Sequence, residues 1–203
     1  MIIGIEGVSC TGKTTLAGSL AERLGWEVMD CYFHVAPDPS SLGRPIATSE
    51  AEQLASLAAH FPVEAQRHRQ ALRAAARDGG VILDRTINTL LAHVRAVGRL
   101  QDLNATVTAR AMVAQQIAAG AATVPDLTLL LIGDAAVLAD RATLRPDLPA
   151  IYYVPAFARH FNAHFEDPIG RCVRLDATAA PGAVVDAALA AISLVQTTHA
   201  RRR

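Results

Sequence analysis

The pattern that most constrains this chain lies near its start, where residues 7–14 read GVSCTGKT. This segment matches G-x-x-x-x-G-K-[ST], the phosphate-binding loop, at every position. An apolar run that reads as a buried strand precedes it over residues 2–6, and leucines spaced by four residues follow it as far as Leu24. We therefore predict a strand–loop–helix unit that binds phosphate groups, the alternative being a chance glycine-rich turn.

Each part of this loop has an expected role. The glycines let the backbone wrap closely, so that its N–H groups and the following helix N-terminus face phosphate oxygens. Lys13 is the only lysine among the 19 Lys and Arg residues, and its compact ammonium group fits between phosphates where a planar guanidinium does not. Thr14 is expected to bind Mg²⁺. The residues expected to hold the nucleotide here are Gly7, Ser9, Cys10, Thr11, Gly12, Lys13, Thr14 and Thr15.

Strand-like and helix-like segments alternate along the rest of the chain. Strands are expected over residues 2–6, 26–30, 81–84, 127–132 and 172–175. Helices are expected over residues 16–24, 49–78 (broken or kinked at Pro62), 87–98, 104–119, 134–143, 150–165 and from 181 onward, with a loop over 35–48. This alternation predicts one doubly wound α/β domain over residues 1–198, with a five-stranded parallel sheet covered by helices on both faces. Residues 199–203 are expected to form a solvated basic tail.

Three further segments fall in a recognisable order after the loop: VILDR at 81–85, PDLTLLL at 125–131 and LDAT at 175–178. Together with the loop they resemble the thymidylate kinase-like enzymes and the deoxynucleoside kinases over almost the whole chain. The resemblance implies a P-loop kinase fold with a short arginine-bearing lid, and ATP and Mg²⁺ as cofactors. It implies that Asp84 holds Mg²⁺ or polarises the acceptor and that Arg85 clamps a phosphate, the alternative being an ordinary ion pair.

The same resemblance assigns roles to the second half of the chain. Arg141 and Arg145 occupy the lid segment, where one of them would stabilise charge on the transferred phosphoryl group. Arg141 could instead lie on the adenine ring. Ala177 and Thr178 would belong to the loop beside the adenine. The chain departs from thymidylate kinases at Ser9, where they usually carry an acidic residue, and at Thr86, where they carry tyrosine, which disfavours thymidylate as the substrate.

Asp30, at the end of the second predicted strand, resembles the general base of uridine kinase-like enzymes. A carboxylate in reach of the acceptor is needed to phosphorylate a hydroxyl group, whereas an acceptor phosphate is already ionised. We expect the second strand to lie beside the loop strand, so that Asp30 faces the γ-phosphate; the alternative is a solvated strand end. Tyr32 and Phe33 would line the acceptor pocket or pack the loop root. Gln66 and Arg67 are weaker candidates for that pocket, because a charged helix segment is usually solvated.

The overall composition narrows the class of protein. The net charge is +0, which argues against a nucleic-acid partner. Three cysteines without C-x-x-C spacing favour a reduced, cytoplasmic protein, and no apolar run approaches the length needed to cross a bilayer. With Lys13 as its only lysine, the chain cannot carry the N-K-x-D motif of regulatory GTPases. The apolar helices over residues 87–120 could form the face of a homodimer.

These observations predict an ATP-dependent kinase that phosphorylates the hydroxyl group of a small, nucleoside-like molecule. Three alternatives stay open at this point: a nucleoside monophosphate kinase of the thymidylate type, a kinase for another hydroxyl compound such as an antibiotic or a sugar derivative, and a nucleotide-binding regulatory module without turnover.

Overall fold

A single parallel sheet forms the centre of the computed structural model, which describes residues 1–145 and 148–200. The sheet has five strands in the order β2-β3-β1-β4-β5. Their bounds are β1 (Ile2–Glu6), β2 (Glu27–Met29), β3 (Val81–Asp84), β4 (Leu127–Ile132) and β5 (Cys172–Asp176). The central strands are nearly continuous runs of Val, Ile and Leu, as expected for strands that are buried on both faces.

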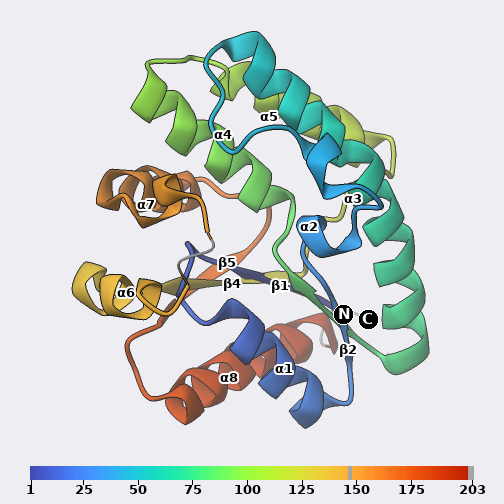
Figure 1. The fold of residues 1–203 in the computed structure, drawn as a ribbon. Helices are drawn as coiled ribbons and strands as arrows, with labels where there is room; N and C mark the ends of the chain where they lie inside the picture. Colours follow the sequence, from blue (N-terminus) through green and yellow to red (C-terminus); the bar gives the residue numbers. More distant parts are fainter. Residues whose placement is uncertain (146–147, 201–203) are drawn as a thin grey trace.

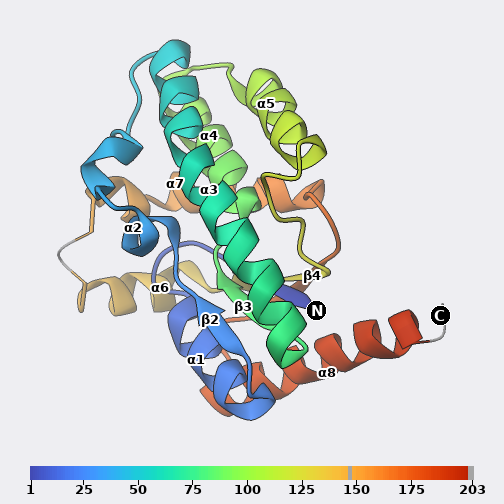
Figure 2. The same ribbon diagram turned by 90° about the vertical axis from the view of Figure 1, so that its right-hand side faces the viewer.

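Helices connect the strands and cover the sheet (Figures 1 and 2). They are α1 (Lys13–Leu24), α2 (Tyr32–Val35), α3 (Glu50–Asp78), α4 (Ile87–Gln101), α5 (Thr106–Ala118), α6 (Ala135–Ala142), α7 (Pro155–Asn162) and α8 (Pro181–Ala200), with the 3₁₀ turns η1 (Pro39–Leu42), η2 (Ala150–Tyr153) and η3 (Ala163–Glu166). Figure 1 shows α1 and α8 on one face of the sheet and α3, α4 and α7 on the other. The predicted fold class is therefore confirmed.

Two buried clusters hold these layers together. On one face, Leu20 of α1 and Ile192 of α8 pack against Ile5 and Leu129 of the central strands. On the other face, Leu130 of β4 lies in a cluster to which α4 and the phenylalanines of α7 also contribute. The strands end at one edge of the sheet, and the segments that follow them there carry the polar residues discussed below.

Helix α3 is one continuous helix with Pro62 inside it, so of the predicted break or kink at this proline, the break did not occur. A proline in a helix interior costs about 3 kcal/mol. Burial of Leu57 before Pro62 and of Val63 and Ala71 after it offsets this cost. Ser49, where the predicted helix begins, caps α3, since its hydroxyl accepts a hydrogen bond from the Glu52 N–H. Part of the predicted loop over 35–48 is helical, because η1 lies within it.

The expected position of β2 beside β1 is wrong. β2 pairs with β3, and β3 pairs with β1, so that one strand separates Asp30 from the loop strand. The register pairs Met29 with Leu83, so the residues that follow, Asp30 and Asp84, lie at the same level at the ends of neighbouring strands. Asp30 therefore neighbours the end of β3 and not the end of β1.

Helix α8 corrects the expectation that no apolar run is long enough to cross a bilayer. Its residues 181–198 are long and apolar enough to cross a membrane by length and composition, with a mean hydropathy of 1.2. The helix also packs Val185, Ala188 and Ile192 into the core beside α1, and core helices can pass the same test. Since α8 runs to Ala200, the predicted tail boundary lies inside a helix, and residues 201–203 lie outside the described residues.

The apolar side chains of α4 are largely buried within the chain itself, against α3, α5 and α7. On α5, Val107 is exposed. A homodimer through these helices stays a prediction.

Candidate active site

Residues 7–12 turn the chain from β1 into α1, as the motif predicts. Gly7 has a φ of 140°, and a Cβ there would lie 2.6 Å from the Leu131 carbonyl oxygen. Gly12 caps α1 in the left-handed conformation with a φ of 92°, and a Cβ there would meet nothing within 4 Å. Packing against Leu131 thus requires glycine at position 7. At Gly12 the backbone faces open space that a phosphate group can enter. Cys10 also has a positive φ of 66°.

Lys13 is buried at the start of α1, and its Nζ donates a 2.7 Å hydrogen bond to the Val8 carbonyl oxygen. The Thr11 hydroxyl donates to the same oxygen at 2.9 Å. Burial, followed by the positive charge of Arg85, lowers the pKa of Lys13 to about 7. The ammonium group therefore lies inside the loop and bonds to a weak neutral acceptor, which phosphate oxygens can replace. Ser9 is partly buried in this loop, and Thr15 is exposed in the first turn of α1.

The Thr14 hydroxyl donates a 3.0 Å hydrogen bond to Asp84 Oδ2 at the end of β3. Asp84 is buried, and its Oδ1 has no hydrogen-bond partner among the described residues. A carboxylate and a hydroxyl are oxygen ligands of the kind that Mg²⁺ prefers. The residues of the described chain include no cluster of three or more His, Cys, Asp or Glu side chains that could hold a metal. Mg²⁺ usually binds through one or two protein oxygens together with substrate phosphates and water, so Thr14 and Asp84 are candidate ligands for it.

Arg85 follows directly and adopts the left-handed conformation, with a φ of 69°. Its N–H donates a 3.0 Å hydrogen bond to the Ile5 carbonyl oxygen of β1. The next peptide is fixed by Glu6, which accepts from the Thr86 N–H at 2.8 Å and the Thr86 hydroxyl at 2.7 Å. Glu6 also accepts from both the N–H and the hydroxyl of Thr89.

Glu6 is fully buried, and burial raises the pKa of its carboxyl group even though these hydrogen bonds lower it. We assigned Glu6 no role from the sequence. The signal that could have found it was an acidic residue in an otherwise apolar strand, directly before the phosphate loop. Glu6 ties the end of β1 to the segment after β3.

Asp30 is exposed at the end of β2, while its backbone carbonyl accepts a 3.0 Å hydrogen bond from Arg67. Tyr32 is buried, and its hydroxyl donates a 2.7 Å hydrogen bond to Glu64 of α3. Of the two predicted roles for Tyr32, this contact supports packing of the loop root. Phe33 is 61% exposed, so it is available to a ligand. Gln66 is partly buried, and Arg67 is buried beneath the strand ends.

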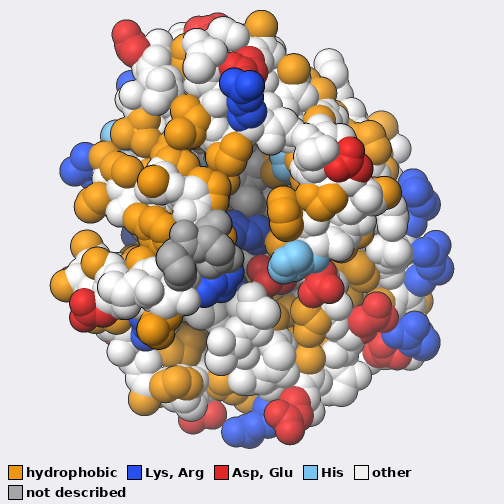
Figure 3. All heavy atoms as spheres, in the orientation of Figure 1, with side chains coloured by type: hydrophobic (Ala, Val, Ile, Leu, Met, Phe, Trp, Pro, Cys, Tyr) orange, Lys and Arg blue, Asp and Glu red, His pale blue; other side chains and the backbone are white. Residues whose placement is uncertain are grey.

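Figure 3 shows a hollow near the middle of this face, between α7 on the left and α2 on the right. Basic, acidic and histidine side chains gather beside it.

His93 of α4 lies against Tyr152 and Phe157, with ring centroids 6.0 and 5.8 Å away. Burial, followed by the charges of His60 and Arg85, lowers the pKa of His93 to about 4. Besides burial, the charge of Arg85 acts on the pKa of both His93 and Tyr152, and the sequence predicted a role for neither residue, because their spacing fits no motif.

The predicted lid contacts the phosphate loop through Arg141. Arg141, near the end of α6, donates a 3.4 Å hydrogen bond from Nη1 to the Cys10 carbonyl oxygen. Arg145 is exposed just after α6, and its carbonyl oxygen accepts a hydrogen bond from the Tyr153 hydroxyl. Arg141 thus already lies at the loop, and the contact of either arginine with a transferred phosphoryl group stays a prediction.

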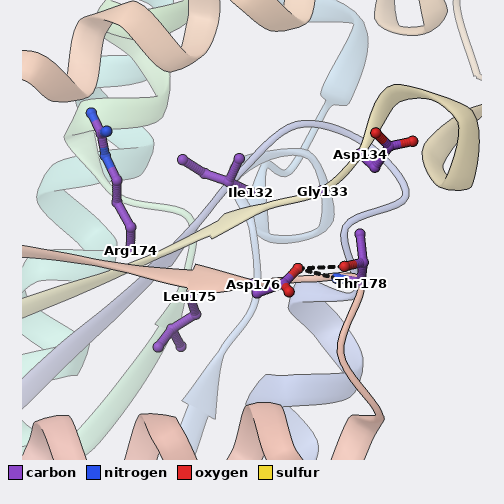
Figure 4. Close-up of a pocket in the computed structure, with 7 residues that line it drawn as sticks. All are labelled: Ile132, Gly133, Asp134, Arg174, Leu175, Asp176 and Thr178. Atoms are coloured by element: carbon purple, nitrogen blue, oxygen red, sulfur yellow. Dashed lines mark hydrogen bonds between the residues drawn. The ribbon is translucent and has the colours of Figure 1, made fainter.

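The predicted adenine-side loop follows β5. Ala177 is buried, and its N–H donates to the Ile132 carbonyl oxygen at 2.8 Å. Thr178 donates from its N–H and its hydroxyl to Asp176 (Figure 4). Asp176 and Thr178 line a pocket with a volume of about 450 Å³, and Figure 4 labels both residues there. Its lining is formed by Ile132, Gly133, Asp134, Arg174, Leu175, Asp176 and Thr178. The pocket lies where β4 and β5 end.

No protein-family model and no curated protein matches the chain. Solved structures of deoxyadenosine kinase from M. mycoides do match it. The structure with products dCMP and a flexible dCDP bound aligns with a TM-score of 0.68 at 13% identity, covering 95% of this chain and 99% of that chain. The structures with bound dATP and dCTP align with TM-scores of 0.65 and 0.61 at 14% identity, each covering 95% of this chain and 100% and 99% of theirs. The chain therefore shares its fold with this deoxyadenosine kinase.

Proposed function

We propose that this protein is an ATP-dependent kinase that phosphorylates a hydroxyl group of a deoxynucleoside-like small molecule. The observation that carries this proposal is the contact between Thr14 of the phosphate loop and the buried Asp84 at the end of β3. It joins a complete phosphate-binding loop to a candidate Mg²⁺ ligand, within a fold shared with deoxyadenosine kinases. The ligands of those kinases, dATP and dCTP among them, support a nucleotide and a deoxynucleoside as the two substrates.

In this proposal Lys13 exchanges the Val8 carbonyl oxygen for oxygens of the β- and γ-phosphates, which places a positive charge where negative charge is transferred. Thr14 and Asp84 would hold Mg²⁺, which neutralises the charge of the phosphates when it is bound. Arg85, at the same strand end, would contact the transferred group, and Arg141 would approach it from α6. The alternative for Arg141, adenine stacking, suits the pocket that follows β5.

The proposed transfer needs one base. The acceptor oxygen forms a bond to the γ-phosphorus while the bond from that phosphorus to the β–γ bridging oxygen breaks, and ADP leaves with that bridging oxygen. The proton of the acceptor hydroxyl goes to Asp30. Asp30 is exposed and lies at the level of Asp84 at the neighbouring strand end, so its carboxylate is free to meet the acceptor.

The proposal also includes the cellular compartment of the enzyme. Cys10, Cys31 and Cys172 are free thiols, which fits a reducing compartment, and we propose the cytoplasm.

The test is an ADP-release assay with purified protein, Mg²⁺ and a panel of acceptors, followed by chromatography of the product. We expect deoxynucleosides to yield monophosphates, and ATP to be a better donor than GTP. Turnover of nucleoside monophosphates alone would replace this proposal with a thymidylate kinase-like one, and turnover of an antibiotic or a sugar alone would change the acceptor class. The Lys13→Ala variant serves as the control for contaminating kinases.

A further inference from the structure

Arg67 of α3 is a cation buried under the ends of two strands. The whole Arg67 residue, backbone included, is only 1% exposed. Its Nε donates to the Asp30 carbonyl oxygen at 3.0 Å, and its Nη2 donates to the carbonyl oxygens of Asp84 at 3.1 Å and Arg85 at 2.9 Å. Its guanidinium carbon lies 4.3 Å from the centre of the Tyr32 ring. The guanidinium group therefore joins the backbone after β2 to the backbone at the end of β3.

The charge of Arg67 is balanced locally. Glu64, one helical turn earlier, lies 3.4 Å from Nη1, and both side chains are 2% exposed. Glu64 is itself fixed by the Tyr32 hydroxyl at 2.7 Å and by the Thr123 N–H at 2.8 Å. A buried ion pair is costly to desolvate unless further hydrogen bonds satisfy it, as they do here. A single buried cation that bonds three converging carbonyl oxygens fixes their separation, because the guanidinium group is planar and rigid.

The carbonyl groups that Arg67 holds flank the strained residue of the site. Left-handed backbone is unfavourable for a non-glycine residue, and it persists where surrounding contacts determine it. At Arg85, Arg67 binds the carbonyl oxygens on both sides of the residue, Ile5 accepts from its N–H, and Glu6 accepts from the next N–H. Four bonds from two other elements, α3 and β1, thus fix the two peptide groups around Arg85.

We propose that Arg67 is a positioning residue that sets the distance between Asp30 and the Asp84–Arg85 pair and holds Arg85 in its left-handed conformation. Arg67 does not contact the acceptor in this proposal. The inference rests on the proposed phosphoryl transfer, in which Asp30 meets the acceptor and Asp84 meets the metal on neighbouring strand ends.

The test compares Arg67→Lys and Arg67→Met with Arg69→Lys, a matched control at an exposed position of the same helix. We expect kcat per folded molecule to fall by about 100-fold in Arg67→Met, as for a small misplacement of catalytic groups. Arg67→Lys should keep more activity than Arg67→Met, while KM for ATP and for the acceptor stay near the wild-type values. A raised acceptor KM with an unchanged kcat would overturn the proposal in favour of direct acceptor contact. Unchanged kcat per folded molecule would assign Arg67 to stability alone and overturn it equally.

A second measurement does not depend on turnover. Hydrogen exchange of a peptide covering residues 81–90 reports the amides of Arg85 and Thr86, which are bonded to Ile5 and Glu6. In Arg67→Lys we expect these amides to exchange faster while the β4 amides keep their protection; unchanged protection would refute the positioning role. If the wild-type protein phosphorylates no acceptor, the proposed function fails, and this measurement still decides whether Arg67 holds the strand end.

Discussion

The hydroxyl of Thr14 and the carboxylate of Asp84 are 70 positions apart in the chain and lie 3.0 Å from each other in the structure. One belongs to the first turn of α1 and the other to the end of β3, which pairs with β1. This contact brings the phosphate loop and the acidic end of β3 into one site. The predictions below follow from this contact and from the groups around it.

Replacing Lys13 with alanine should reduce phosphoryl transfer by about 10²–10³-fold, the range seen when one preorganised donor to a developing charge is lost. The fold should persist, because within residues 1–145 and 148–200 the hydrogen bond of this side chain goes to the Val8 carbonyl oxygen alone. Steady-state kinetics and a thermal melt of the same sample check both parts. Arg23→Ala, in the last turn of the same helix, should behave like the wild type. Turnover near the wild-type rate in Lys13→Ala would rule out the kinase proposal.

Activity should require a divalent metal and depend on Asp84. Removing metal with EDTA should abolish transfer, and Mg²⁺ or Mn²⁺ should restore it. Asp84→Asn should need a higher Mg²⁺ concentration, by about tenfold or more, because the amide is a weaker ligand for a hard cation. A Mg²⁺ titration of the rate measures this shift, with Asp102→Asn at the end of α4 as the control. Full activity in excess EDTA would contradict the assignment.

Asp30→Asn should lower kcat by about 10²–10⁴-fold, the range for loss of a general base. ATP affinity should barely change, since the substitution keeps the backbone carbonyl that Arg67 binds. Rate measurements and a nucleotide titration on the same variant separate the two quantities, with Asp38→Asn in the following exposed loop as the control. Normal turnover in Asp30→Asn would place the base elsewhere, and Asp84 would be examined next.

Folding stability should fall as the pH drops below the ordinary histidine range. His93 has its pKa lowered to about 4 by burial, so between roughly pH 6.5 and pH 4 the unfolded chain binds a proton that the folded chain does not. The free energy of unfolding should therefore decrease with falling pH over this window, by at most about 1.4 kcal/mol per unit for this residue. His164, whose pKa is also lowered to about 4 mainly by burial, adds to the same trend.

Urea denaturation at about pH 7 and about pH 5 measures this dependence. His93→Phe keeps a ring beside Tyr152 and Phe157 and should show a shallower decrease than the wild type. Equal decreases in the two proteins would mean that His93 is not the group that responds.

The sequence by itself determined the parts of this protein that depend on local chemistry. The phosphate loop follows from its glycines and its single lysine, and the strands follow from short apolar runs. The cap of α3 follows from Ser49, whose hydroxyl accepts from the backbone three residues later. In each case the residues that form the feature are close together in the chain, so that spacing and residue type are sufficient to indicate it.

Only the tertiary structure decided how distant residues meet. The order of the strands put β3 between β2 and β1 and so brought Asp30 beside Asp84, against expectation. Pro62 remained inside a helix because packing on both sides of it outweighed a local preference. In the sequence Glu6 had no predicted role and Arg67 was a weaker candidate for the acceptor pocket, yet both are buried and bond to backbone groups around Arg85. The physical reason is that a buried charge takes its role from partners that only the folded chain brings within hydrogen-bond distance.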